Sequence, residues 1–379
     1  MTRALNDATP RQRLRDLGVT IGRMEPGPLN AITDVAGVRV GHATIVSGEG
    51  PLTVGQGPVR TGVTVILPHE GDVGTDPLFA GSHTLNGNGE MTGLLWVKES
   101  GMLTSPIALT NTHSVGTVRD ALITYEIERL HRPELYWSLP VVAETYDGWL
   151  NDINGMHVKA EHVYAALDSA SGGPVEEGCV GGGTGMICHE FKGGIGTSSR
   201  TLSEEDGGWT VGVLVQANYG ARHLLRIDGV PVGDLIPCSQ VPGFREERAR
   251  LERRDGDGSI IIVVATDAPL LPHQCERLAQ RATIGLARVG GIGANSSGDI
   301  FLAFATGNRG LAGAEDDRAE PTPCRMVANG RMTPLFEACA EATEEAILNA
   351  LCMATTTVGI GGRTMYALPL DRVREVCAT

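Results

Sequence analysis

Short runs of apolar, β-branched residues recur along this chain and constrain its fold more than any other feature. They cover residues 38–46, 63–67, 140–143, 210–216, 260–265 and 300–305. Each run has the length and composition of a β-strand. Several are apolar at nearly every position, which is expected for strands that are buried on both faces. The sequence therefore predicts sheets that are covered on both sides by other layers.

Helical segments lie between and after these runs. Residues 113–131, 272–289 and 333–354 carry apolar side chains at helical spacing. The third segment has the clearest start, with Thr333 expected at the N-cap and Pro334 in the first helical position. The mixture of strands and helices predicts an α+β protein, and no internal repeat is visible.

Glycine is unusually abundant, with 51 residues among 379, about twice the usual share of about 7%. Such a density indicates tight turns and close approaches between backbones. Two glycine-rich segments, GGGTG at 181–185 and KGGIG at 192–196, might suggest a phosphate site. Neither matches a nucleotide-binding pattern. We therefore expect tight turns there, and no cofactor.

The charge and the N-terminal segment exclude several classes of partner. The formal net charge is −14, whereas nucleic acids and anionic membranes require clustered basic surfaces. The chain has no apolar run long enough to span a membrane. Its first twenty residues are polar, lack a secretory signal and are expected to form an arm. We expect a cytoplasmic protein.

Cysteine and histidine spacing does not predict a metal site. The eight cysteines and ten histidines are scattered, with no CxxC or HExxH pattern. We expect reduced cysteines, several of them in the core. No cysteine has the histidine partnership of a cysteine hydrolase.

The most informative junction lies at Ser259. Residues 239–258 hold ten charged residues of both signs and end in Asp-Gly-Asp-Gly, and the apolar strand 260–265 follows Ser259 directly. One interpretation is a surface loop or short helix, with Ser259 ending a turn. The other is an autocatalytic nucleophile that attacks the carbonyl of the small, flexible Gly258 and becomes a new N-terminus. Its α-amine, with a pKa of about 7.7–8.0, would then serve as the base for its own hydroxyl.

The chain resembles the L-aminopeptidase D-amidase/D-esterase (DmpA-like) family, to which the β-aminopeptidases are related. The resemblance covers nearly the whole chain. The matching segments are RLRDLGVTIGRMEPGPLNAITDVAGVRVGHATI (13–45), GSHTLNGNGEMTGLLWVKESG (81–101), NTHSVGTV (111–118), VVAETYDGWLNDING (141–155), GGGTGMICHEFKGGIGTSSR (181–200), VGVLVQANYG (211–220), DGSIIIVVATDAPLLPHQ (257–274) and GANSSGDIFLAFATGN (293–308).

The resemblance implies roles for single residues. Gly258 and Ser259 stand at the family's cleavage site, which makes Ser259 the catalytic nucleophile. Asn218 is implied as the oxyanion donor, and Tyr146 as a second hydroxyl donor. Glu144 is implied as the anchor for the substrate's ammonium group. On an extended strand, positions 144 and 146 share a face. Without the resemblance, Asn218 is an ordinary turn residue, Glu144 a surface acid and Tyr146 a core tyrosine.

Three further residues are implied near the nucleophile. Ser297 and Asp299 match a serine and an acidic residue that hold the new N-terminal amine, although some relatives have Glu at the second position. Their alternative is a simple Asx-type turn. Trp137 is a candidate wall of the side-chain pocket.

The resemblance also implies a fold and a reaction. The expected fold is a four-layer αββα sandwich similar to N-terminal-nucleophile hydrolases, with a different chain connectivity. One catalytic domain, residues 1–379, would be split into chains 1–258 and 259–379. We expect release of N-terminal residues from short peptides, amino-acid amides or esters by a homo-oligomer, commonly a tetramer. The alternatives are a preference for β-amino acids, an acyltransferase similar to ornithine acetyltransferases, and an unprocessed scaffold that binds without cutting.

Overall fold

The computed structural model describes residues 10–244, 258–313 and 320–378. The strands are β1 (Arg39–Ser47), β2 (Val59–Leu67), β3 (Leu78–Gly87), β4 (Met102–Leu103), β5 (Ile107–Asn111), β6 (Val141–Thr145), β7 (Ile187–Cys188), β8 (Phe191–Lys192), β9 (Gly194–Thr201), β10 (Thr210–Asn218), β11 (Gly258–Thr266), β12 (Ser297–Ala305), β13 (Thr357–Val358) and β14 (Thr364–Met365). The α-helices are α1 (Leu94–Ser100), α2 (Val115–Arg129), α3 (Ala160–Asp168), α4 (Val232–Leu235), α6 (Pro272–Val289), α7 (Thr333–Met353) and α8 (Leu370–Cys377).

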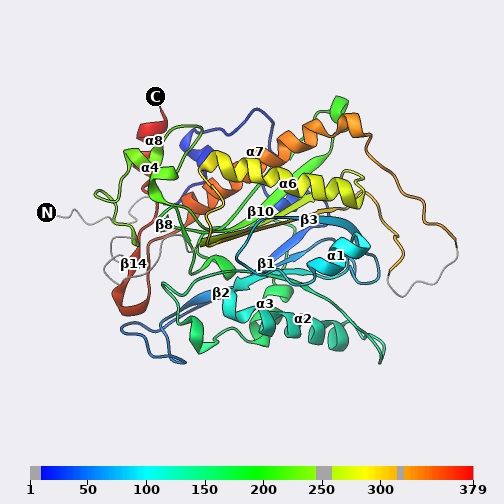
Figure 1. Ribbon diagram of the computed structural model, residues 1–379, viewed down its shortest axis with the longest axis horizontal. Helices are drawn as coiled ribbons and strands as arrows, with labels where there is room; N and C mark the ends of the chain where they lie inside the picture. The colour runs from blue at the N-terminus through cyan, green and yellow to red at the C-terminus, as the bar shows by residue number, and fades with distance from the viewer. Residues whose placement is uncertain (1–9, 245–257, 314–319, 379) are drawn as a thin grey trace.

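Two sheets and two pairs of helices form four layers. One sheet has the order β1-β2-β5-β6, and the other has the order β4-β3-β12-β11-β10-β9. In Figure 1, α6 and α7 lie above the sheets, and α2 and α3 lie below them. The predicted αββα sandwich is confirmed.

The central strand β11 shows why its sequence is apolar at every position. Ile260, Ile262 and Val264 belong to the core that the larger sheet shares with α6 and α7. Ile261 and Val263 belong to the core between the two sheets. Because successive side chains of a strand point to opposite faces, both faces of β11 are buried. By the same alternation, Ser259 points toward the space between the sheets.

The two strands that pair with β11 determine which residues lie beside Ser259. β10 pairs with β11 antiparallel and places Asn218 opposite Ser259. β12 pairs with β11 parallel and places Ser297 opposite Gly258 and Gly298 opposite Ser259. Segments that are far apart in the sequence therefore meet at one end of the larger sheet.

Helix α7 is buried on nearly all sides, whereas the sequence predicts a single apolar stripe. It packs against the larger sheet, α6 and the N-terminal segment. Its buried Glu341 and Glu345 pair with the fully buried Arg200 of β9, at 3.0 and 2.7 Å. Removing one partner from such a pair leaves an uncompensated buried charge. The helix begins at Thr333, and Met332 rather than Thr333 occupies the N-cap.

The N-terminal segment is not a free arm where the structure describes it. Leu14 and Leu17 are buried, and the Arg11 side chain donates to the carbonyl of Cys352 at 2.7 Å. The expectation of an arm is therefore wrong for residues 10–20, and residues 1–9 lie outside the described part. Residues 245–257 of the charged segment before Ser259 also lie outside it.

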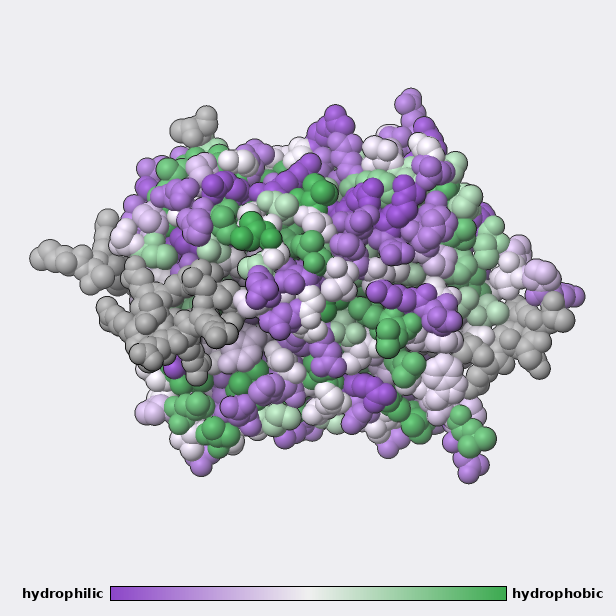
Figure 2. All heavy atoms as spheres, in the orientation of Figure 1, coloured by the Kyte–Doolittle hydropathy of each residue, from purple (hydrophilic) through white to green (hydrophobic). Residues whose placement is uncertain are grey.

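The surface is mixed in character. Figure 2 shows small hydrophobic patches separated by hydrophilic residues on the face in view. Among the residues that the structure describes, Leu95 and Leu135 are the most exposed large apolar ones, at 87% and 91%. Within the described ranges, no helix combines the length and the apolar character that crossing a membrane requires.

Candidate active site

Ser259 opens into a cavity of about 400 Å³ between the two sheets. The cavity is lined by Asn88, Gly89, Glu90, Thr112, Glu144, Tyr146, Gly258, Ser259 and Ser296. The side chain of Ser259 is largely buried, and its Oγ accepts a hydrogen bond from the backbone N–H of Gly298 at 3.2 Å. The hydroxyl is therefore held at the cavity wall.

Gly258 is packed against the neighbouring strand. A Cβ at this position would lie 2.7 Å from the carbonyl oxygen of Asn218 and 2.9 Å from the Cα of Tyr219. Both are backbone atoms, so a side chain cannot be accommodated without moving the strands. The residue before Ser259 must therefore be glycine for the pairing with β10 to persist.

If the chain is cleaved before Ser259, as the resemblance implies, replacing Gly258 by Ala is expected to slow that cleavage by about tenfold or more. Forcing a methyl group into a packed site costs about 1–3 kcal/mol, and about 1.4 kcal/mol corresponds to tenfold in rate. The fraction of uncleaved chain, followed by mass spectrometry after synthesis, measures the effect. Gly116→Ala is the control because its Cβ would meet nothing within 4 Å. Cleavage of Gly258→Ala at the unaltered rate would contradict this account.

Both ends of the Asn218 amide are held. Its Oδ1 accepts from the backbone N–H of Ile187 at 2.8 Å, and its Nδ2 donates to the carbonyl of Tyr146 at 2.9 Å. These bonds define the orientation of the amide, with Nδ2 on the side of Tyr146. Since an amide nitrogen carries two hydrogens, the bond to Tyr146 leaves one. Asn218 pairs with Ser259 in the strand register, but it is not among the residues that line the cavity of Ser259.

Glu144 is buried at the wall of the same cavity. Thr112 donates its hydroxyl hydrogen to Oε2, and the backbone N–H of Glu90 donates to Oε1 at 3.0 Å. Burial raises the pKa of Glu144, and these two hydrogen bonds partly offset the rise. Burial removes the water that would stabilise the charged form of the carboxylate. A cationic group that enters the cavity stabilises that charged form again, so the site favours a cation.

Tyr146 lines the cavity as expected, but it does not lie on the strand that was expected to place it there. β6 ends at Thr145, so Tyr146 lies just past the strand instead of sharing a strand face with Glu144. Its side chain is 39% exposed and lines the cavity. The structure thus brings both residues to the cavity of Ser259, Glu144 from β6 and Tyr146 from just beyond it, although they do not share a strand face.

Ser297 and Asp299 lie on the other side of the larger sheet. The Ser297 hydroxyl donates to Asp299 Oδ1 at 2.6 Å. Both line a second cavity of about 590 Å³, and Gly258 lines both cavities. Burial raises the pKa of Asp299. The pair therefore approaches the backbone at the Gly258–Ser259 junction, not the Ser259 hydroxyl.

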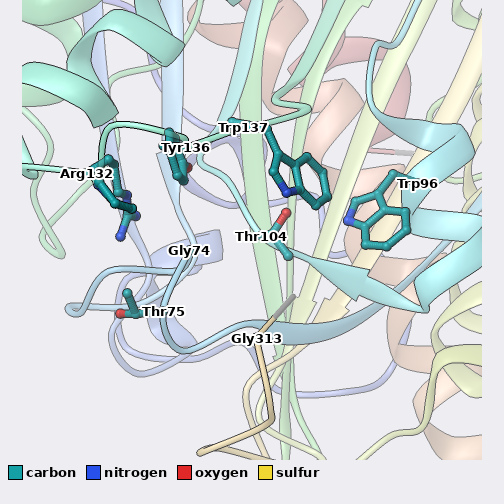
Figure 3. Close-up of a pocket in the computed structure, with 10 residues that line it drawn as sticks. Gly74, Thr75, Trp96, Thr104, Arg132, Tyr136, Trp137 and Gly313 are labelled. Carbon is teal, nitrogen blue, oxygen red and sulfur yellow. The ribbon is translucent and has the colours of Figure 1, made fainter. Parts of the chain in front are cut away.

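Trp137 lies elsewhere. It lines a cavity of about 290 Å³ together with Trp96, Arg132, Tyr136 and others. Figure 3 shows the rings of Trp137 and Trp96 next to each other, with centroids 5.5 Å apart and ring planes at 76°, an edge-to-face arrangement. Trp137 is not among the residues that line the cavity of Ser259, so the structure does not place it at the nucleophile.

Several groups at the site were missed from the sequence. Thr112 and Glu90 hold Glu144, and the N–H groups of Ile187 and Gly298 hold Asn218 and Ser259. Thr112 lies in the segment NTHSVGTV, which already carries the resemblance, so its hydroxyl offered a signal. Backbone donors offer none, because any residue supplies an N–H. Within the described ranges, no three His, Cys, Asp or Glu side chains gather into a metal site.

Comparison with known proteins identifies the family. Residues 30–365 match Peptidase family S58. The chain is 49% identical to beta-peptidyl aminopeptidase BapA from Sphingosinicella microcystinivorans, over 96% of this chain and 91% of that protein.

Solved structures agree with this match. The beta-aminopeptidase of a Burkholderia species has a TM-score of 0.86 and 55% identity, covering 96% of this chain and 99% of its own. The L-aminopeptidase D-Ala-esterase/amidase of Ochrobactrum anthropi, described as a variant of the Ntn hydrolase fold, has a TM-score of 0.86 and 42% identity, covering 98% of each chain. The chain is thus an aminopeptidase, and it belongs to Peptidase family S58.

Proposed function

We propose that this aminopeptidase processes itself and works through an N-terminal serine nucleophile. The observation that carries the proposal is the placement of Ser259, after a glycine that strand packing requires, in a cavity that also holds the buried carboxylate Glu144. Such a cavity offers a nucleophile at one wall and an anchor for a substrate's ammonium group at another. No metal or organic cofactor is part of this chemistry.

Processing begins at the Gly258 carbonyl carbon. The Ser259 Oγ attacks this carbon and loses its proton, the C–N bond breaks, and the proton reaches the departing nitrogen. Water then hydrolyses the resulting ester, which leaves a carboxylate on Gly258 and a free amine on Ser259. Asp299 and Ser297, which border the junction from the second cavity, would hold this amine.

The same serine then acts on substrates. The neutral Ser259 amine accepts the hydroxyl proton as Oγ attacks the substrate carbonyl. The amide of Asn218 and the hydroxyl of Tyr146 donate to the developing oxyanion. The leaving amine takes the proton and departs, and water releases the acyl group by the reverse sequence. Peptides, amino-acid amides and esters all fit these steps.

The two products of cleavage would remain one catalytic unit. β11 and β12 come from residues 259–379, apart from Gly258, while β10 and β3 on either side come from residues 1–258. Strands of the smaller chain are thus flanked by strands of the larger chain and are covered by α6 and α7. Separating the chains would expose both cores, so we propose a single αββα domain built from two chains.

A preference for N-terminal β-amino acids is the second candidate within this function. It is favoured by the 49% and 55% identity to proteins described as β-aminopeptidases, against 42% to the L-aminopeptidase. Matched p-nitroanilides of L-alanine and β-homoalanine would separate the two, and N-acetyl-ornithine would test acyl transfer. If the protein hydrolyses neither of the two anilides, the proposed function is contradicted.

Glu144→Gln is expected to lower kcat/KM by about ten- to hundredfold, mainly through KM. A hydrogen bond to a charged group contributes about 1.5–3 kcal/mol, and the amide keeps the size of the side chain but not its charge. Steady-state kinetics on an amino-acid anilide measures the effect. An ester substrate without an amino group is the control and should be unaffected. Equal losses on both substrates would contradict the anchor role.

We also propose that the protein is cytoplasmic and that copies of this chain associate with one another, in keeping with the homotetramer that the resemblance implies. The exposed Leu95 and Leu135 lie near the Trp96–Trp137 pair in sequence, and all belong to α1 or the segment after α2. Exposed apolar side chains that gather in one region are typical of protein interfaces.

A further inference from the structure

A fully buried lysine contacts the turn that holds Asn218, the candidate oxyanion donor. Lys192 in β8 has no exposed surface. Its Nζ donates to the carbonyls of Gly183, Met186 and Gly193 at 3.2, 2.8 and 2.8 Å. Three acceptors match the three hydrogens of an ammonium group, whereas a neutral amine has only two. The contacts of Nζ therefore suit the charged form, although burial lowers the pKa of Lys192.

One of these carbonyls belongs to the peptide group that holds Asn218. The carbonyl of Met186 and the N–H of Ile187 are parts of the same planar peptide group. The carbonyl accepts from Lys192 Nζ and also from the backbone N–H of Gly193, at 2.9 Å. The N–H donates to Asn218 Oδ1 at 2.8 Å. A continuous chain of hydrogen bonds therefore runs from the buried ammonium group to the side-chain amide of Asn218.

A positive charge at one end of such a chain polarises every group along it. An ammonium group at a carbonyl oxygen draws electron density toward that oxygen, which makes the N–H of the same peptide group a stronger donor. A stronger donor to Asn218 Oδ1 has the same effect on the hydrogens of Nδ2. Hydrogen bonds in a chain strengthen one another by about 10–30% per bond. Lys192, Ile187 and Asn218 are all buried, and a charge acts more strongly where the dielectric is low.

A purely structural role is the alternative for Lys192. The ammonium group ties together three backbone segments, and this tie alone stabilises the turn. However, the three acceptors are carbonyl oxygens and not carboxylates, and burying a charge without an anion is costly. Neutral donors can tie carbonyls together without that cost. The charge itself therefore needs an explanation that the tie does not supply.

We propose that Lys192 is a positioning residue for the reaction, which fixes and polarises the 186–187 peptide group so that Asn218 donates more strongly to the developing oxyanion. The inference rests on the proposed role of Asn218. Lys192 is not among the residues that line the cavity of Ser259, so it acts through Asn218 and not on the substrate. Its effect should therefore appear when negative charge develops, in kcat and not in KM.

Lys192→Met removes the charge and keeps an unbranched side chain. It should lower kcat by about three- to thirtyfold and change KM less than about twofold, because Asn218 stays in place and a complete loss of the donor costs about 10²–10³-fold. Steady-state kinetics on an amino-acid anilide, with the cleaved fraction of the protein, measures both constants.

Phe191→Leu is the matched control for this variant. Phe191 is the other residue of β8 and is fully buried, so its replacement disturbs the packing there without changing a charge. It should lower the temperature of thermal unfolding and change kcat less than about twofold, since its effect is on packing. Equal losses of kcat in Phe191→Leu and Lys192→Met would overturn the proposal.

Lys192→Gln separates the charge from the hydrogen-bonded tie. It keeps donor hydrogens but has no charge, so it should lose kcat as Lys192→Met does, and it replaces Lys192→Met in every comparison if that variant does not fold. An unaltered kcat in Lys192→Gln would show that the charge contributes nothing and would overturn the proposal.

A double-mutant cycle with Asn218→Ala tests whether Lys192 acts through Asn218. Adding Lys192→Met to Asn218→Ala should lower kcat less than about twofold further, because the polarised chain then ends before the substrate. Losses that add in full would overturn the proposal. The cycle also identifies a failure of the proposed function. If Asn218→Ala alone leaves kcat unaltered, Asn218 is not the oxyanion donor; if it lowers kcat and Lys192→Met does not, only the inference on Lys192 is overturned.

Discussion

Replacing Ser259 by Ala is expected to lower kcat/KM by at least about 10⁴-fold, because removing a catalytic nucleophile leaves only binding and oxyanion contributions. The loss follows from the geometry of the cavity. The Gly298 N–H holds the Ser259 Oγ at the wall of the cavity that Glu144 and Tyr146 also line. Release of p-nitroaniline from an amino-acid anilide measures the effect.

Ser259→Cys is the matched variant for this prediction. A thiol can attack both the Gly258 carbonyl and a substrate, so this variant should be cleaved and keep a low activity that iodoacetamide removes. The unaltered protein treated with the same reagent is the control for alkylation of the other cysteines. Substantial activity in Ser259→Ala would show that another group is the nucleophile.

Asn218→Ala is expected to lower kcat by about 10²–10³-fold with a smaller change in KM, which is the usual effect of removing one oxyanion donor. The donor acts only when negative charge develops on the substrate oxygen, so its loss falls on kcat. The same variant should cleave itself slowly, because its own processing forms a similar oxyanion. The kinetics are therefore measured on the cleaved fraction.

Two controls separate this effect from a loss of structure. Asn218→Ala leaves the Ile187 N–H without its acceptor, which costs about 1–3 kcal/mol of stability, so thermal unfolding is measured alongside activity. Asn88→Ala removes an amide from the wall of the cavity of Ser259 and should change kcat less than tenfold. Comparable losses of kcat in Asn218→Ala and Asn88→Ala would contradict the role of Asn218 as the oxyanion donor.

Apolar elements were predictable from the sequence because their signal is local. The helix predicted over 272–289 is observed with those bounds, and the run 260–265 forms most of β11. Both bury apolar side chains at a regular period. This period can be recognised in the local sequence, without knowledge of the rest of the chain.

Strands with polar sequences were not predictable in this way. β9 reads GIGTSSRT and is almost wholly buried. Its Ser198 hydroxyl donates to Asn30, and its Arg200 pairs with two glutamates of α7. These partners come from distant parts of the chain, so the local sequence resembles a loop. β3 and β5 were missed for related reasons, since glycine or polar residues interrupt their apolar runs.

The site was predictable only in part. The glycine–serine junction before a buried strand made a nucleophile one of two interpretations of Ser259, and the resemblance decided between them; Asn218 and Glu144 were named through the resemblance alone. Strand register places Asn218 opposite Ser259, and register depends on tertiary pairing. Trp137 shows the limit of the argument, because it lies between the matching segments 111–118 and 141–155, and the resemblance did not indicate which cavity it lines.

The intact mass of the purified protein under denaturing conditions tests the central claim most directly. The account predicts two polypeptides, one ending at Gly258 and one beginning at Ser259, that run as a single species under native conditions. The Ser259→Ala variant should give one chain of 379 residues. A fully active protein that shows only the single chain would contradict self-processing and the role of the Ser259 amine as base.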